Sequence, residues 1–259
     1  MKHGAVAASA KPSRPLQQAP ENGYRRHMTS TEMRPAGNPA EDVANPRPDN
    51  RGGRTMDRKL LAWGHAAHRR GARLPVLWLF TDFARLPDPR AAVTRLPRGL
   101  AGVVLRHDAD PARARLGRDL ARICRGRRLA LVVAGDVRLA AALGAGVHLR
   151  DGRWPGRARP LGRTRGYPIG PRAGLITSSA HDAAAARRAR RAGADMVFLS
   201  PAFPTASHPG APALGPIRWT AMVRASSAAA AALGGVDGGS IRRLPRRYCQ
   251  AIGAIGALA

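Results

Sequence analysis

The sequence predicts a (β/α)8 barrel of the α/β class, and three observations support this prediction. Short apolar runs alternate with helical patterns, as expected for parallel strands that helices connect. The alternation gives eight strands within about 200 residues, at the lower end of the size range of such barrels. Small and polar residues follow several strands, where barrels build their sites. The first strand-helix turn lacks a G-x-G-x-x-G motif, which argues against the alternative, an open doubly wound sheet.

Composition divides the chain into a tail and one domain. Residues 1–55 are rich in Pro, Gly, Asn, Ser and charged residues and poor in apolar ones, so we expect a disordered tail. Met28 and Met56 are alternative starts, in which case part of this tail would be an annotation artefact. Residues 56–259 are expected to form the barrel, and that length is enough for a substantial core.

Apolar runs give the strands in order. A first helix is expected over 57–70, because Leu60, Trp63 and Ala67 recur at helical spacing. The eight strands are predicted over 74–80, 101–105, 129–134, 146–149, 174–178, 196–199, 229–233 and 251–258. The chain ends after the last of these, so we expect a barrel without the usual final helix.

Helix signals lie between these runs. Asp110 followed by Pro111 is a cap with Pro at the first helical position. Asp182 caps a helix that runs to about Ala192, where Gly193 ends it. Further helices are expected over 137–143, 216–226 and 240–247, and a long loop over 150–172.

A motif in the second half of the chain carries a family resemblance. Three segments occur in order, Ser179-Ala180-His181, Gly193-Ala194-Asp195 and the run from Ser200 to His208 that reads SPAFPTASH. The chain here resembles the thiamine phosphate synthase and TenI family, whose pattern is S-x-H, G-A-D and G-P-x-F-P-T-x-T-K. The resemblance implies a barrel over about 74–258, with the helix before the first strand covering the barrel floor.

Glycines follow strands seven and eight, where barrels frequently bind phosphate. Gly234 and Gly235 end one strand, and Ile255 and Gly256 end the other. Glycine lets backbone N–H groups approach an anion closely, and the resemblance implies the phosphate of a thiazole substrate as the ligand. The alternative is that glycine relieves crowding at barrel corners.

The resemblance assigns the remaining site residues. Thr205, Ser207 and His208 match the P-T-x-T-K loop that contacts a leaving pyrophosphate, and Ser179 matches a serine that contacts the same group. His replaces the family's Lys at position 208, which makes that positive charge depend on pH. The alternative is a surface loop bounded by prolines.

Two residues match the family's reactive groups. His181 matches the histidine that TenI-type thiazole tautomerases use to move a proton, although it could instead cap the following helix. Arg106 matches the Arg of a Q-x-R-x-K strand, with Val104 in place of the Gln and Asp108 in place of the Lys. His148, in the middle of a strand, is interpreted as structural.

The resemblance also implies a Mg²⁺ site. Asp136 matches the Asp of an N-D pair that holds magnesium, but Gly135 replaces the Asn. Arg153 stands where a second Asp is expected, and Asp151, two residues earlier, is a substitute. Mg²⁺ takes one or two carboxylates together with substrate phosphates, so Asp136 and the substrate could suffice.

Net charge and cysteines bear on partners and location. The formal charge is +28, but only three residues are Lys, and the abundance of Arg, Ala, Gly and Pro is typical of a GC-rich coding sequence. No basic block alternates with aromatic residues, so nucleic acid is not favoured as a partner. Two cysteines without metal spacing fit a reducing cytoplasm, and Cys124 is expected in the core. No apolar run reaches the ~18 residues of a membrane span.

The hypothesis that these features favour is a thiamine phosphate synthase-like enzyme. The resemblance implies that it joins hydroxymethylpyrimidine diphosphate to thiazole phosphate and releases pyrophosphate. One alternative is a metal-independent TenI-like tautomerase that uses His181. Another, of a different class, is a non-catalytic binder of phosphate ligands or nucleic acid. The sequence leaves open the oligomeric state, including a homo-oligomer.

Overall fold

Eight parallel strands close into a barrel, in a computed structural model that describes residues 56–156, 174–205, 210 and 212–259. Each strand pairs with its neighbour in sequence, and β8 pairs with β1 to close the ring. The strands are β1 (Leu77–Phe80), β2 (Ala101–Leu105), β3 (Ala130–Ala134), β4 (Gly146–Leu149), β5 (Ile176–Ala180), β6 (Met196–Leu199), β7 (Ala230–Leu233) and β8 (Ala251–Ala254). The predicted fold class is therefore confirmed.

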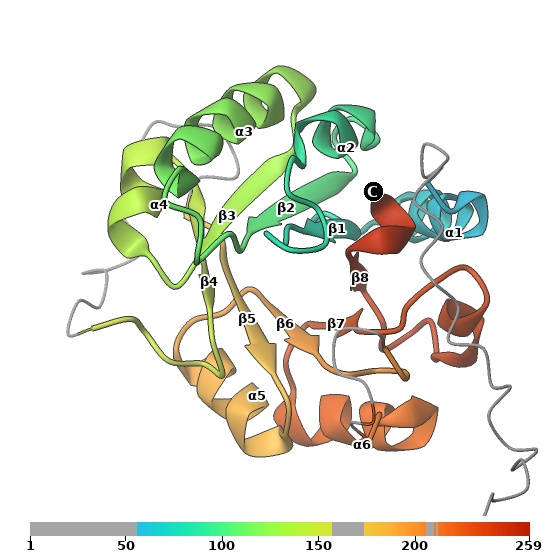
Figure 1. The fold of residues 1–259 in the computed structure, drawn as a ribbon. Coiled ribbons are helices and arrows are strands. Elements are labelled where there is room, and N and C mark those ends of the chain that lie inside the picture. Colours follow the sequence, from blue (N-terminus) through green and yellow to red (C-terminus); the bar gives the residue numbers. More distant parts are fainter. Residues whose placement is uncertain (1–55, 157–173, 206–209, 211) are drawn as a thin grey trace, which may run out of the picture. The chain divides into compact units, whose positions relative to one another are not determined.

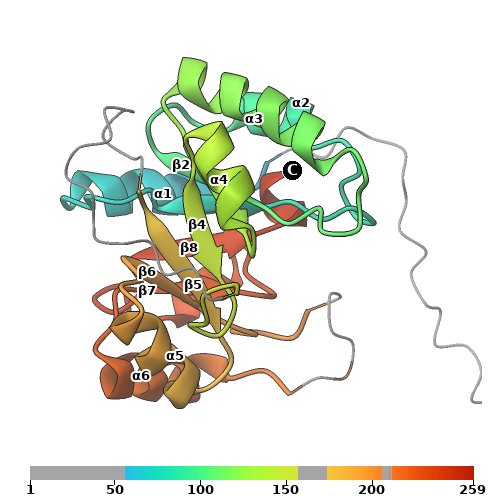
Figure 2. The ribbon, with the colours of Figure 1, turned by 90° about the vertical axis from the view of Figure 1, so that its left-hand side faces the viewer.

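Helices lie around the outside of the strands (Figure 1). In two perpendicular views, α2 and α3 lie on one side of the strands and α5 and α6 on the opposite side (Figures 1 and 2). The α-helices are α1 (Arg58–Arg69), α2 (Arg90–Arg95), α3 (Arg113–Arg127), α4 (Val137–Leu143), α5 (Ala183–Arg191) and α6 (Gly215–Ser226). Two short 3-10 helices, η1 (Ser240–Arg243) and η2 (Gly256–Leu258), follow β7 and β8.

Alternation along each strand produces two core layers. In β1, Leu77 and Leu79 belong to the layer between strands and helices, whereas Trp78 and Phe80 belong to the barrel interior. The interior is filled by aromatic rings in edge-to-face contact: the ring centroids of Phe80 and Phe198 are 4.9 Å apart, and those of Trp78 and Phe198 are 5.7 Å apart. These rings fill the barrel interior, and Phe80 borders the open space at the carboxyl ends of the strands.

Several elements differ from the sequence prediction. β5 lies two residues later than the predicted 174–178. Helix α3 begins at Arg113 with Ala112 as its N-cap, so the prediction of Asp110 as the cap and Pro111 as the first helical residue is wrong. β1 begins three residues later than expected, and β8 ends at Ala254, after which η2 turns the backbone. The helix expected over 240–247 is the short η1, and α2 was not expected. Residues 1–55 and 157–173, which contain the predicted tail and most of the predicted long loop, lie outside the described residues.

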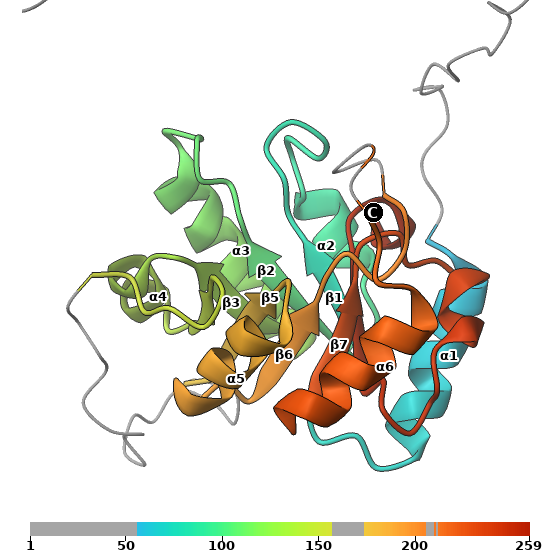
Figure 3. The ribbon, with the colours of Figure 1, turned by 90° about the horizontal axis from the view of Figure 1, so that it is seen from below.

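Helix α1 lies against the outer wall of the barrel and not across its floor, which corrects what the resemblance implied. The backbone N–H of its cap, Asp57, donates to the carbonyl oxygen of Ala257 (3.0 Å), just after β8. Halfway along α1, Gly64 lies on the outward-facing side chain of Leu77 in β1. Figure 3 shows α1 at the edge of the barrel, beside the C-terminal segment. The helix therefore covers the seam between β8 and β1.

A membrane-spanning helix is not found in the part of the chain that the structure describes.

Candidate active site

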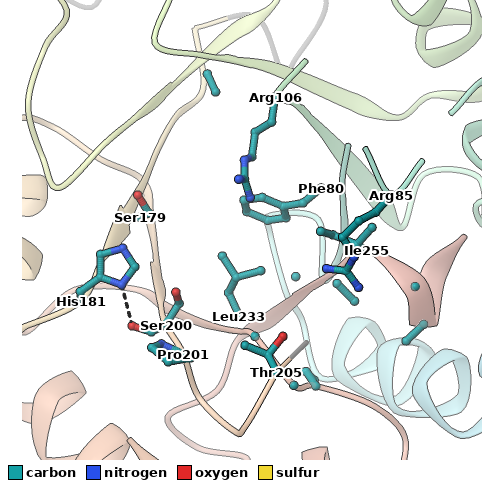
Figure 4. Close-up of a pocket in the computed structure, with 18 of the residues that line it drawn as sticks. Phe80, Arg85, Arg106, Ser179, His181, Ser200, Pro201, Thr205, Leu233 and Ile255 are labelled. Atoms are coloured by element: carbon teal, nitrogen blue, oxygen red, sulfur yellow. Dashed lines mark hydrogen bonds between the residues drawn. The ribbon is translucent and has the colours of Figure 1, made fainter. Parts of the chain in front are cut away.

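A cavity of about 570 Å³ opens where the strands end. Residues at the ends of all eight strands line it, and Phe80 of the barrel interior lies at its base. Figure 4 shows Arg85, Arg106, Ser179, His181 and Thr205 around the same space, although they come from separate strand ends. The structure thus brings together residues that are distant in sequence, at the face where barrels carry their sites.

Arg106 and Ser179 enter the cavity from firmly held backbone. The N–H of Arg106 donates to the Thr81 hydroxyl at the end of β1 (2.9 Å), and that hydroxyl also bonds His107. Ser179 is part of β5, in register with Phe198 of β6. Both predicted residues line the cavity, so a polar or anionic group there would meet a guanidinium and a hydroxyl.

His181 is held in one tautomer by its contact with the next strand end. Its Nδ1 lies 2.9 Å from the carbonyl oxygen of Ser200 (Figure 4). A carbonyl only accepts, so Nδ1 carries the hydrogen and Nε2 of the neutral ring carries a lone pair. The cap of α5 is Asp182, whose Oδ1 accepts from the N–H of Ala185. The alternative in which His181 caps that helix is therefore wrong.

Backbone hydrogen bonds join the beginning of the loop after β6 to its end. The N–H of Leu214 donates to the carbonyl of Pro201 (2.9 Å), and the N–H of Gly215 donates to that of Ala202 (3.0 Å). Thr205 lines the cavity from this loop. Ser207 and His208, which the resemblance assigns to the same loop, lie outside the described residues.

The four predicted residues after β7 and β8 all line the cavity: Gly234, Gly235, Ile255 and Gly256. Gly234 and Gly235 have φ of +86° and +63°, and a Cβ on Gly235 would lie 2.2 Å from the carbonyl oxygen of Pro204. Close packing against the β6 loop is thus one reason for glycine at position 235. The carboxylate of Asp237 lines the same side, and hydrogen bonds from Ser240 and Gly239 lower its pKa.

Whether Mg²⁺ fits this site depends on the carboxylates that follow β2, β3 and β4, and on the partners that their oxygens already have. Asp136 accepts from the N–H of Leu139 through Oδ1 (2.9 Å) and has Oδ2 3.9 Å from Arg113. The two oxygens of Asp108 face Arg113 and Arg150.

The buried Oδ1 of Asp151 has no hydrogen-bond partner, and Asp151 lines the cavity whereas Asp136 does not. Within the described ranges, no three His, Cys, Asp or Glu residues form a group that could hold a metal ion. These donors alone do not fit Mg²⁺, and ligation by Asp136 stays a prediction.

Among the residues that line the cavity without having been assigned to it are Arg85, His148 and Arg150. His148 is buried, and its Nδ1 bonds the hydroxyl of Thr177 (2.9 Å). Arg150 had been read as the first residue of a loop. The signal that could have identified it is its place directly after β4, because barrel sites are built from residues at the carboxyl ends of the strands.

Comparison with known proteins agrees with this geometry. The family model described as thiamine monophosphate synthase matches residues 86–258, which is most of the described barrel. The chain belongs to this family. Members of one family share the barrel and differ mainly in the loops that carry the site.

Curated relatives cover most of the barrel. The chain is 33% identical to a thiamine-phosphate synthase of Halorhodospira halophila over 180 residues, which are 66% of this chain and 81% of that protein. It is 35% identical to a thiamine-phosphate synthase of Chromobacterium violaceum over 148 residues, 56% of this chain and 68% of that protein. These homologues support a role in thiamine biosynthesis and an enzyme of the transferase class.

A solved structure shows the same fold. Thiamine phosphate pyrophosphorylase from Pyrococcus furiosus superposes with a TM-score of 0.55 at 22% identity, covering 72% of this chain and 87% of that one. At this identity the likeness concerns the fold alone.

Proposed function

We propose that this protein joins hydroxymethylpyrimidine diphosphate to thiazole phosphate and releases pyrophosphate. The bond between the pyrimidine methylene carbon and the diphosphate oxygen breaks first. The thiazole nitrogen then attacks the resulting pyrimidine cation, and the electron pair of the broken bond leaves with pyrophosphate. The substrates are small-molecule phosphates, and two free, buried cysteines suit a reducing cytoplasm as the place of action.

One observation carries this proposal: residues that match the family's substrate contacts line a single cavity. Arg106, Ser179 and Thr205 lie there together with the glycines after β7 and β8. A dissociative reaction asks a protein to hold two partners close together and to stabilise the departing charge. The guanidinium of Arg106 and the hydroxyls of Ser179 and Thr205 are suitable donors to a pyrophosphate.

The cavity divides into two halves in this proposal. The thiazole phosphate lies at the glycine turns after β7 and β8, and the pyrimidine diphosphate lies between the ends of β2, β5 and β6. The open base above Phe80 receives the pyrimidine ring, because an aromatic floor suits a flat ring. Ser207 and His208 complete the pyrophosphate contacts as predicted from the sequence.

A single reaction tests the proposal. The full chain is mixed with thiazole phosphate, pyrimidine diphosphate and Mg²⁺, and thiamine phosphate is measured by chromatography. We expect product, and we expect Arg106→Gln to lower kcat by about tenfold or more, since it removes a charged donor from the departing group. Absence of product with folded protein would contradict the synthase proposal.

The dependence of the rate on Mg²⁺ is measured in a separate experiment, because the resemblance implies that the reaction uses this ion. Such an ion would supply positive charge to a leaving pyrophosphate. Asp136→Asn keeps a side chain that caps α4 but removes the carboxylate charge. If Asp136 holds the ion, this variant needs more Mg²⁺ for half-maximal rate. An unchanged Mg²⁺ dependence would reject that assignment.

The tautomer of His181 favours a second candidate, a TenI-like thiazole tautomerase. With Nδ1–H donated to Ser200, Nε2 is a base that can accept and return a proton. In that case the thiazole tautomer is converted in EDTA, and His181→Gln abolishes conversion. If His181→Gln converts the tautomer as fast as the unmodified protein does, this second function is excluded.

A further inference from the structure

Charged groups from three neighbouring strand ends meet at one corner of the cavity. Asp108 follows β2, Asp136 follows β3 and Arg150 follows β4. Arg113, at the start of α3, lies 3.2 Å from Asp108 and 3.9 Å from Asp136. Arg150 pairs with the other oxygen of Asp108 (2.5 Å). Asp108 is therefore held from both sides by guanidinium groups.

Arg150 remains accessible to a ligand in this arrangement. Its side chain is 58% exposed, whereas that of Arg113 is 16% exposed. Both Arg150 and Asp108 line the cavity, and Arg113 does not. A guanidinium has five N–H donors in a fixed fork, and the bond to Asp108 uses one of them. The remaining fork is well suited to phosphate oxygens.

Gly135 makes room for this guanidinium. A Cβ at position 135 would lie 3.5 Å from Cζ and Nη2 of Arg150, which is already van der Waals contact. Gly135 also has a φ of +66°, a backbone conformation that by itself favours glycine. The Gly at 135, the Asp at 108 and the Arg at 150 are thus mutually consistent parts of one arrangement.

The positive charge at this corner comes from the end of β4 in this chain, and from the end of β2 in the family's pattern. The family's pattern has a Lys at position 108, and this chain has Asp there. The loss of that cation from β2 coincides with an Arg on β4 that reaches the same corner. Asp108 also fixes the direction of the Arg150 side chain, so the substituted residue retains a role in positioning positive charge.

We propose that Arg150, oriented by Asp108, binds the pyrophosphate group of the substrate and product, and supplies the positive charge that position 108 lacks. This inference rests on the proposed function, since it names a contact to the leaving group. In this role Arg150 is a binding residue and Asp108 is a positioning residue.

Calorimetric titration of inorganic pyrophosphate into the full chain tests this contact without turnover. The buffer contains EDTA, so that no metal contributes. We expect Arg150→Gln to weaken pyrophosphate binding by about tenfold or more, as for loss of hydrogen bonds to a charged group. Arg138→Gln, an exposed Arg of α4 outside the cavity wall, is the matched control and should change the affinity less than twofold.

Two results would overturn the contact. One is equal pyrophosphate affinity in Arg150→Gln and the unmodified chain. The other is no measurable pyrophosphate binding by the unmodified chain. Either can be seen whether or not thiamine phosphate is formed, so failure of this inference is distinct from failure of the synthase proposal.

A double variant tests the exchange of charge. Asp108→Lys combined with Arg150→Gln moves the cation back to β2. Recovery of most of the pyrophosphate affinity lost in Arg150→Gln is expected, because the same corner gains a positive charge and loses the negative charge of Asp108. No recovery would overturn the exchange. A purely structural Asp108–Arg150 ion pair predicts a lower unfolding midpoint in each variant and no specific effect on pyrophosphate.

Discussion

His148 is an ionisable residue inside an aromatic interior. Its ring lies against Phe80 and Phe198, with centroids 5.5 and 5.9 Å away. Burial, followed by the charges of Arg106 and Arg150, lowers its pKa to about 3. The imidazole is therefore neutral at the base of the cavity, as the interpretation of His148 as structural requires.

This lowered pKa predicts a loss of stability in mild acid. The unfolded chain binds a proton at His148 below its ordinary pKa of 6.5, whereas the folded chain binds it only near pH 3. Stability is thus fully present above pH 6.5 and falls between pH 6.5 and 3. Between pH 7 and pH 5 the loss from this residue is about 2 kcal/mol.

Urea unfolding at pH 7 and pH 5 measures this effect. His148→Gln should show a smaller difference between the two pH values than the unmodified protein. An equal pH dependence in His148→Gln and the unmodified chain would show that His148 does not cause it.

Individual site residues were predictable where a motif fixed their place. Arg106, Ser179 and Thr205 lie at or beyond the ends of strands that the sequence marks clearly, and all three line the cavity. Arg150 was missed because its neighbours are also Arg, Gly and Pro, so that it resembles a loop residue. Only the register of β4 shows that it reaches Asp108, and no local pattern contains that information.

Apolar runs predicted most strands to within a residue, because buried parallel strands leave continuous hydrophobic stretches. β8 was predicted too long, since apolar residues continue through η2 although the backbone turns at Ile255. Helix α2 was missed because it has six residues and its N-cap, Pro89, makes no side-chain hydrogen bond. Short helices of this kind depend on packing against the barrel and not on local signals.

Two glycines in helices predict opposite effects of alanine. In α1, a Cβ on Gly64 would lie 2.8 Å from Cγ of the buried Leu77. Gly64→Ala should therefore destabilise the barrel by about 1–3 kcal/mol through overpacking. In α3, a Cβ on Gly126 meets nothing within 4 Å. Gly126→Ala should raise stability by up to about 1 kcal/mol, because Ala favours helix.

Thermal or urea unfolding of the two variants checks this contrast. If Gly64→Ala lowers the free energy of unfolding and Gly126→Ala raises it, α1 is tightly packed on β1. A gain in stability for Gly64→Ala would mean that α1 is loosely docked and that its helix propensity dominates.

The two cysteines report on the unfolding of the whole barrel. Cys124, on α3, and Cys249, just before β8, are both buried, and burial raises the pKa of each thiol to about 12. At pH 8 neither forms the reactive thiolate in the folded state. Labelling with a thiol reagent should be slow in buffer and reach both cysteines in urea. Rapid labelling of either cysteine in buffer would reveal local opening near it.

Helix α1 has a consequence for the connectivity of the barrel. It begins beside Ala257, after β8, and leads into β1, so it fills the position of an eighth helix although it comes first in the chain. A circularly permuted protein should exploit this, with residues 72–259 followed by a short linker and residues 56–71. We expect it to fold to the same barrel with unchanged ligand affinity, since chain ends that lie close together tolerate rejoining. In this barrel the helix that covers the β8–β1 seam therefore precedes the first strand in the sequence, instead of following the last one.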